Sequence, residues 1–217
     1  ILEEVFRNTL KRKYGSDEMR VLFAHGFEGG PSGSKPTYMR EVLGWEVTSP
    51  IMSELGWDIE SQTKVLLRCI DENDFDLVIG SSMGGLAAAN ASSMRSDSDF
   101  RLLLIAPAFG LSESWEGLSE DELAKWKDSG VRTYRGFELE IDLDWNFMEV
   151  AKRMSWPEVA HHTTIVHGSK DDVVSLSVSE TVSSISEIVE LVVIDDGHRM
   201  KKCLPKLEGL VSDLMFR

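Results

Sequence analysis

Short apolar runs alternate with longer helical patterns along this chain, and that alternation limits its fold more than any other feature. Six of the runs hold mainly Val, Ile and Leu, as expected of strands that are buried on both faces. They cover residues 21–24, 45–48, 77–80, 102–105, 164–166 and 191–194. Parallel strands joined by helices produce this pattern, so the sequence predicts an α/β fold with a mainly parallel central sheet.

The stretches between these runs space their apolar residues as helices do, over residues 59–72, 84–94, 177–186 and 201–215. In the first stretch Val65, Leu66, Cys69 and Ile70 share one face. We therefore expect helices on both faces of a sheet of about six strands. A single domain over residues 1–217 is expected, because α/β chains of about 200 residues commonly stay undivided. Residues 1–19 have the pattern of a charged helix.

One segment departs from the alternation of strands and helices. From residue 109 to residue 161 the chain is longer than a strand–helix unit requires. Residues 113–144 contain ten acidic and four basic residues, a net charge of −6 out of −14 for the chain. The segment is also rich in Trp, Tyr and Phe. A long insertion inside a compact α/β domain is more often a functional lid than an idle loop. We expect a lid, or cap, over about residues 110–160.

Residues 137–145 of that insertion alternate strictly between apolar and acidic side chains. Four carboxylates so close together suggest a metal site, but a strand with its charges in water fits the period of two better. His161, His162 and His167 have no Cys or carboxylate at the spacing of metal ligands. We expect neither a metal nor another cofactor.

The balance of charge excludes several classes of partner. With 37 acidic and 23 basic residues, the chain repels phosphate backbones and anionic lipid, so neither a nucleic-acid nor a membrane partner is expected. No apolar run approaches the roughly 18 residues of a membrane span, and residues 1–6 lack the basic start of a secretory signal. A cytoplasmic protein, monomeric or a small homo-oligomer, is expected. Cys69 and Cys203 are too few and too far apart for a zinc site or a disulfide scaffold, so both are expected to be reduced packing residues.

The strongest local signal is G-x-S-x-G at residues 80–84, directly after the run that ends at Ile79, with Ser82 at its centre. In this arrangement a sharp turn from strand to helix holds the serine in a strained backbone conformation and projects its hydroxyl above the sheet. The flanking glycines let strand and helix approach each other closely. A glycine-rich turn without any chemistry is the alternative.

A nucleophilic serine needs a base, and the base needs a carboxylate that orients it. The strand at 164–166 is followed by H-G-S-K-D-D, and the strand at 191–194 by D-D-G-H. This gives the chain order Ser, Asp, His that the architecture requires. We assign His198 as the general base and, on spacing, Asp171 as its partner. Asp172 is the alternative, and it would otherwise cap the following helix or face solvent.

The loop H-G-F-E-G-G at residues 25–30 follows the first strand and supplies the remaining requirement, an oxyanion hole. We expect the backbone N–H groups of Phe27 and Met83 to converge on the developing oxyanion. A phosphate-binding loop is rejected, because Lys35 is followed by Pro36 and the fixed motif is absent. His25 is expected to bond the loop backbone rather than to act as a catalyst.

The motifs at 25–26, 80–84, 167–171 and 197–198 together resemble the α/β-hydrolase superfamily from Val21 onward. More narrowly, the loops at 26–35, 80–85, 105–108 and 196–199 are similar to those of small bacterial serine carboxylesterases related to the acyl-protein thioesterase and acyl-glucuronide esterase type. The resemblance implies an α/β-hydrolase fold. Two features depart from it: residues 1–19 do not contain the first two strands of larger members, and the acidic insertion is distinctive.

These features predict a serine hydrolase that cleaves carboxylic esters with short to medium acyl chains through an acyl-enzyme on Ser82. Phe109, Trp115 and Trp145 are candidates for the substrate pocket, although each also suits the core. The negative charge disfavours anionic substrates such as acyl-CoA. A thioesterase acting on acylated proteins or other acyl thioesters is the first alternative. A hydrolase-fold sensor without turnover is the second, and the complete set of Ser82, Asp171 and His198 argues against it.

Overall fold

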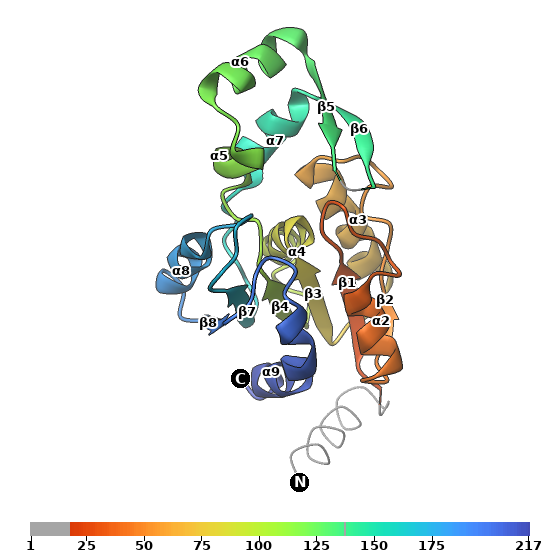
Figure 1. The fold of residues 1–217 in the computed structure, drawn as a ribbon. Coiled ribbons are helices and arrows are strands. Elements are labelled where there is room, and N and C mark those ends of the chain that lie inside the picture. Colours follow the sequence, from red (N-terminus) through yellow and green to blue (C-terminus); the bar gives the residue numbers. More distant parts are fainter. Residues whose placement is uncertain (1–17, 137) are drawn as a thin grey trace.

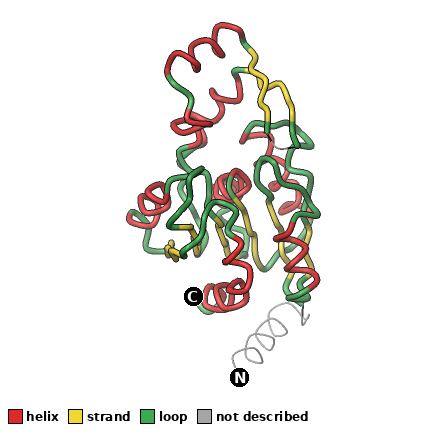
Figure 2. Tube along the Cα trace, in the orientation of Figure 1, coloured by secondary structure: helices red, strands yellow, loops and turns green. Residues whose placement is uncertain are grey.

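A computed structural model describes residues 18–136 and 138–217, and its centre is a six-stranded sheet (Figures 1 and 2). The strands lie in the order β2-β1-β3-β4-β7-β8, and every neighbouring pair is parallel. Their bounds are β1 Arg20–Ala24, β2 Glu46–Thr48, β3 Leu77–Ser81, β4 Arg101–Ile105, β7 Thr163–Gly168 and β8 Val189–Ile194. Each predicted run overlaps one of these strands, with Trp45 alone outside β2, and the predicted α/β fold is confirmed.

Helices cover both faces of the sheet. Alternate residues of each strand point to opposite faces, so each face forms its own apolar core with the helices that cover it. On one face Leu22, Val78 and Leu104 belong to a core formed with α3, α4 and α8. On the other face Val21 and Ile79 pack in a second core with α2 and α9. The bounds of these helices are α2 Ser34–Glu41, α3 Ile59–Glu72, α4 Met83–Met94, α8 Leu176–Ser184 and α9 Leu207–Met215.

The predicted helix over residues 201–215 is wrong as one continuous helix. A 3-10 helix, η2 Lys201–Lys206, precedes α9. Pro205 lies inside this first part, and its ring has no backbone N–H to continue a regular α-helix. The helix expected over residues 1–19 falls almost wholly outside the described residues. None of the described helices has the length and apolar character needed to cross a membrane.

The segment between β4 and β7 forms a separate layer, drawn in green and teal at the top of Figure 1. We call residues 110–160 the cap. Its elements are α5 Leu111–Ser114, η1 Trp115–Gly117, α6 Glu120–Ser129, β5 Val131–Arg135, β6 Glu140–Asp144 and α7 Asn146–Met154. Strands β5 and β6 pair antiparallel into what we call the cap hairpin.

The alternating segment at 137–145 supplies β6, with Leu143 buried and Asp142 and Asp144 exposed. The strand interpretation of this pattern is therefore confirmed over residues 140–144, while Phe137 lies outside the described residues. The cap hairpin is closed at its base by α6, where the Trp126 indole donates to the Leu143 carbonyl at 3.0 Å. The carboxylates of β6 thus lie on the outer surface of the cap.

Gly84 sits where α4 crosses β1, and substitution there is expected to destabilise the fold. A Cβ on Gly84 would lie 2.6 Å from the carbonyl carbon of Ala24 and closer still to the carbonyl oxygens of Ala24 and His25. Because backbone cannot yield as a side-chain tip does, Gly84→Ala is expected to lower the free energy of unfolding by about 2–3 kcal/mol. Urea unfolding measures this loss.

Gly209 provides the matched control, because it also lies in a helix but has no heavy atom within 4 Å of an added Cβ. Gly209→Ala is expected to raise the free energy of unfolding by about 0.5–1 kcal/mol through the higher helix propensity of alanine. Equal unfolding midpoints for the two variants would contradict the close approach of α4 to β1.

Candidate active site

Ser82 joins β3 to α4 in a strained turn. Its backbone has φ 54° and ψ −121°, a region that residues with a Cβ rarely adopt. The glycines on either side make the turn possible: a Cβ on Gly80 would lie 2.6 Å from the α-carbon of Gly85. The Ser82 side chain is therefore presented at the carboxyl end of the sheet rather than packed along the helix.

Hydrogen bonds to the neighbouring strand hold this turn in place. The Ser82 N–H donates to the Ile105 carbonyl at 2.9 Å, and the Ser82 carbonyl accepts from the Ala108 N–H at 3.0 Å. Ala106, between these partners, also has a positive φ of 45°. Two adjacent strained turns thus support each other at the ends of β3 and β4.

The structure brings together the three side chains that the sequence analysis assigned to catalysis. His198 Nε2 lies 3.0 Å from Ser82 Oγ, and His198 Nδ1 lies 2.8 Å and 3.0 Å from the two carboxylate oxygens of Asp171. The Asp171 side chain has no exposed surface, whereas 21% of the His198 side chain is exposed. With a proton on Nδ1 donated to Asp171, Nε2 is left to accept the proton of the Ser82 hydroxyl.

The loop after β7 is built around the Asp171 carboxylate. Its Oδ1 accepts from the N–H groups of Val173 at 3.0 Å and Val174 at 2.9 Å. Burial alone raises the pKa of Asp171, but hydrogen bonds from His167, His198 and these two amides outweigh burial and hold the pKa well below its ordinary value. The carboxylate is therefore charged throughout the physiological range. Asp172, the alternative partner, is exposed.

His167 is a neighbour of Asp171 that the sequence analysis missed. Its Nε2 lies 3.2 Å from Asp171 Oδ2 and 3.0 Å from the Val174 carbonyl, while its Nδ1 lies 2.7 Å from Ser179 Oγ. The side chains of His167 and Asp171 are both fully buried. Ligand-spacing rules did not reveal this contact, although the four-residue separation in H-G-x-x-D was a usable signal.

Gly168 lets the loops that carry Asp171 and His198 meet backbone to backbone. A Cβ on Gly168 would lie 2.9 Å from the carbonyl carbon of Asp196. The Lys170 N–H donates to that same residue's carbonyl at 3.0 Å. From the other side, Lys35 Nζ donates to the Arg199 carbonyl at 3.1 Å. The position of His198 is therefore fixed from two directions.

The loop at residues 25–30, which we call the oxyanion loop after the role that the sequence predicts for it, lies directly beside Ser82. An added Cβ on Gly26 would be 3.3 Å from Ser82 Cβ and 3.9 Å from Ser82 Oγ. Met83 is the first residue of α4, so its N–H has no acceptor within the helix. Among the described residues the Phe27 N–H donates to no backbone carbonyl. The Met83 amide belongs to the residue after Ser82, and the Phe27 amide belongs to the residue after Gly26, whose added Cβ would lie 3.9 Å from Ser82 Oγ.

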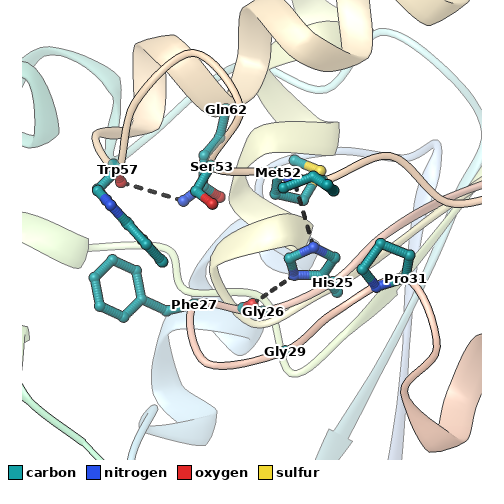
Figure 3. Close-up of a pocket in the computed structure, with 10 residues that line it drawn as sticks. His25, Gly26, Phe27, Gly29, Pro31, Met52, Ser53, Trp57 and Gln62 are labelled. Atoms are coloured by element: carbon teal, nitrogen blue, oxygen red, sulfur yellow. Dashed lines mark hydrogen bonds between the residues drawn. The ribbon is translucent and has the colours of Figure 1, made fainter. Parts of the chain in front are cut away.

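His25 anchors the oxyanion loop, as the sequence predicted. Its Nδ1 lies 2.9 Å from the Gly26 carbonyl, and its Nε2 accepts from the Met52 N–H at 3.2 Å (Figure 3). Burial lowers the pKa of His25, which favours the neutral ring whose Nε2 can accept the Met52 N–H. A small pocket of about 60 Å³ separates this loop from the loop that contains Met52 and Trp57.

The three aromatic residues proposed for a substrate pocket occupy different places. Trp115 lies against the Phe27 ring, with ring centroids 5.0 Å apart. Phe109 has no exposed surface and stacks on Trp156. Trp145 packs edge-on against Trp126. Only Trp115 of the three is thus seen to contact a residue of the oxyanion loop.

The cysteines and further histidines were considered as possible metal ligands in the sequence. Among the described residues no three His, Cys, Asp or Glu side chains are grouped as a metal would require. Cys69 and Cys203 are free thiols, and burial raises the pKa of Cys203 to about 11. His161 is buried between Ser92 Oγ and the Ser98 carbonyl and has a lowered pKa because of that burial.

Comparison with known proteins places the chain in a family. The model of the family described as Uncharacterised protein family (UPF0227) matches residues 20–214. The chain belongs to this family. The matched range takes in the oxyanion loop, the Ser82 turn, the cap and the His198 loop of this UPF0227 member. No curated protein sequence is significantly similar to the chain.

Solved structures show that this UPF0227 member has the α/β-hydrolase fold. Alpha/beta hydrolase domain-containing protein 10 from mouse is 21% identical, with a TM-score of 0.75, over 90% of this chain and 89% of that one. Est1E from Butyrivibrio proteoclasticus is 20% identical, with a TM-score of 0.72, over 92% and 87%. The monoacylglycerol lipase of Paleococcus ferrophilus is 14% identical, with a TM-score of 0.71, over 90% and 93%.

Proposed function

We propose that the protein is a serine hydrolase that cleaves carboxylic esters. One observation carries the proposal: Asp171, His198 and Ser82 form an unbroken line of hydrogen-bonding contacts of 2.8–3.0 Å that ends on a serine in a strained strand-to-helix turn. A buried, charged carboxylate behind an imidazole stabilises the cation that forms when the imidazole accepts a proton. A binding module has no use for this arrangement.

In the first half-reaction the Ser82 hydroxyl oxygen attacks the ester carbonyl while His198 Nε2 takes its proton. The N–H groups of Phe27 and Met83 donate to the oxygen that becomes negative, assisted by the positive end of α4. The tetrahedral intermediate then collapses: the bond to the alcohol oxygen breaks, and that oxygen receives the proton from His198. The alcohol leaves and Ser82 carries the acyl group.

In the second half-reaction water replaces the alcohol. His198 accepts a proton from the water as its oxygen attacks the acyl carbonyl, and the bond to Ser82 Oγ breaks. The proton returns to Ser82, and a carboxylic acid is released. Asp171 keeps its negative charge throughout, in keeping with the low pKa that its hydrogen bonds enforce.

The cap is the proposed source of substrate preference. Trp115, beside Phe27, is our candidate for contact with the acyl or alcohol part of the ester. Because the Phe109 ring is fully buried, it would contact substrate only after a movement of the cap. The acidic outer surface of the cap disfavours anionic substrates. We therefore propose neutral esters with short to medium acyl chains.

A panel of p-nitrophenyl esters of increasing chain length, run beside matched acyl thioesters, tests this function. We expect hydrolysis of the neutral esters, fastest for short and medium chains, with kcat/KM at least about 10-fold higher than for acyl-CoA. A thioesterase would show the reverse preference on neutral thioesters. A wild-type rate no higher than that of Ser82→Ala on every substrate would contradict the proposed function.

A further inference from the structure

The cap packs against the oxyanion loop at the side chain of Phe27. The Phe27 ring is surrounded by four others at centroid separations of 5.0–6.1 Å, all edge-on. These are the rings of Trp57, Trp115, Tyr134 and Phe147. Three of them belong to the cap. The residue whose amide is the proposed oxyanion donor is thus anchored, through its own ring, in another part of the chain.

The next residue of the loop, Glu28, makes a second contact with the cap hairpin. The Tyr134 hydroxyl donates to Glu28 Oε1 at 3.0 Å. Burial, together with this carboxylate, raises the pKa of Tyr134 to about 12, so the hydroxyl stays a donor at any working pH. Gly136 lies against the same carboxylate, because a Cβ there would overlap Glu28 Oε1 and lie 2.7 Å from Glu28 Cδ. The same Cβ would lie 2.9 Å from Tyr134 Cε1, so a side chain at Gly136 would force Glu28 and the Tyr134 ring apart.

The oxyanion loop is thereby held from two sides. On the side of the sheet, the Gly26 carbonyl lies 2.9 Å from both His25 Nδ1 and the Gly29 N–H nitrogen, which donates to it. This carbonyl and the Phe27 N–H belong to one planar peptide group, so fixing the carbonyl restrains the N–H. On the side of the cap, the restraint comes from the rings around Phe27 and from Tyr134 on Glu28.

We propose that Tyr134 is a positioning residue for the oxyanion hole: it docks the cap hairpin on Phe27 and Glu28 and so keeps the Phe27 N–H aligned. This inference rests on the proposed function. We call the contacts of Tyr134 with Phe27 and Glu28 the clamp. Because the clamp acts on the oxyanion rather than on the bound ester, its loss lowers kcat and leaves KM close to the wild-type value. A whole oxyanion donor is worth about 10²–10³ in rate, so loosening one is expected to cost about 5–20-fold.

Two variants break the Tyr134–Glu28 contact in different ways. Tyr134→Phe keeps the ring on Phe27 and removes the hydroxyl, whereas Gly136→Ala keeps the hydroxyl and forces the Glu28 carboxylate and the Tyr134 ring apart. Thr133→Val is the matched control. It removes a hydrogen bond of the neighbouring residue, from Thr133 Oγ1 to Asp142 Oδ1 at 2.7 Å, that stays within the cap hairpin. All three positions lie on one short stretch of chain, so general loosening of the hairpin affects them alike.

Three measurements follow for each variant: kcat and KM on a p-nitrophenyl ester, the inhibition constant of a trifluoromethyl ketone, and hydrogen exchange of the amides in residues 25–30. The ketone forms a tetrahedral adduct on serine and so reports the oxyanion hole. We expect Tyr134→Phe and Gly136→Ala to lower kcat and to raise the inhibition constant of the ketone by the same factor of about 5–20. We expect KM to stay within about twofold of the wild-type value. The double variant is expected to match either single one, because both remove one contact.

The possible outcomes separate the two proposals. If loop exchange in Tyr134→Phe equals that in Thr133→Val, the clamp does not exist and this inference is overturned whatever the protein catalyses. If exchange accelerates but kcat and ketone affinity match the control, the catalytic role of the clamp is overturned. If wild type neither hydrolyses the ester nor binds the ketone, the proposed function fails and takes the oxyanion role with it, while faster exchange would still establish the coupling of cap and loop.

Discussion

Replacing Ser82 with alanine is expected to lower kcat/KM for ester hydrolysis by about 10⁴-fold or more. The hydroxyl oxygen is the atom that carries the acyl group in the proposed mechanism, and it lies 3.0 Å from the nitrogen that would take its proton. Alanine accepts the same backbone strain as serine, so the fold is expected to persist. Stopped assays on p-nitrophenyl butyrate at high enzyme concentration measure the residual rate.

Ser93→Ala is the matched control for this variant. Ser93 lies on the same helix, α4, but is exposed near its end. Its substitution is expected to leave kcat/KM within about twofold, since isolated surface changes rarely alter more. If Ser82→Ala retained a tenth or more of the wild-type activity, another group would have to be the nucleophile.

Asp171→Asn is expected to lower kcat by about 10³–10⁴-fold. Asparagine keeps the shape of the side chain but removes the charge that stabilises protonated His198, and its amide N–H₂ competes with the Nδ1–H that His198 must donate. The matched control is Asp172→Asn, which makes the same chemical change on the adjacent exposed residue. Kinetics on the same ester, with circular dichroism to check folding, compare the two. An equal loss of kcat in the two variants would show that Asp171 is not the carboxylate that supports His198.

The low pKa of Asp171 also sets the sign of a pH effect. Because the folded-state pKa lies below the ordinary value of 3.8, the stability that this carboxylate contributes is complete above about pH 4 and is lost as pH falls further. Between pH 5 and 8 Asp171 therefore adds no acid limb to the rate. The proposed mechanism depends on a lone pair at His198 Nε2, because that atom takes the Ser82 proton.

The sheet and the three aligned side chains were predictable from the sequence for a physical reason. Strands buried on both faces must be apolar runs, and a parallel sheet brings the loops after its strands to one edge. The loops that follow β3, β7 and β8 therefore all lie at the same edge of a sheet built from these runs. The strained turn at Ser82 was equally predictable, because the close approach of strand and helix there requires glycine at positions 80 and 84.

The secondary structure of the cap was less predictable from the sequence. Its elements are short, and only β6 was predicted, from its alternating apolar and acidic residues. The elements α5, η1, α6, β5 and α7 were not predicted. The contact of Tyr134 with Glu28 joins residues 106 apart in the chain and has no local signature. His167 was missed for a different reason: it was tested only as a metal ligand, although H-G-x-x-D places it four residues before Asp171.

Covalent labelling shows whether Ser82 is an activated nucleophile. Wild type and Ser82→Ala are each incubated with a fluorophosphonate at pH 8 and examined by intact mass spectrometry and peptide mapping. We expect one adduct per wild-type chain, carried by Ser82, and none on Ser82→Ala. An unlabelled wild type, or equal labelling of Ser82→Ala, would contradict this role of Ser82.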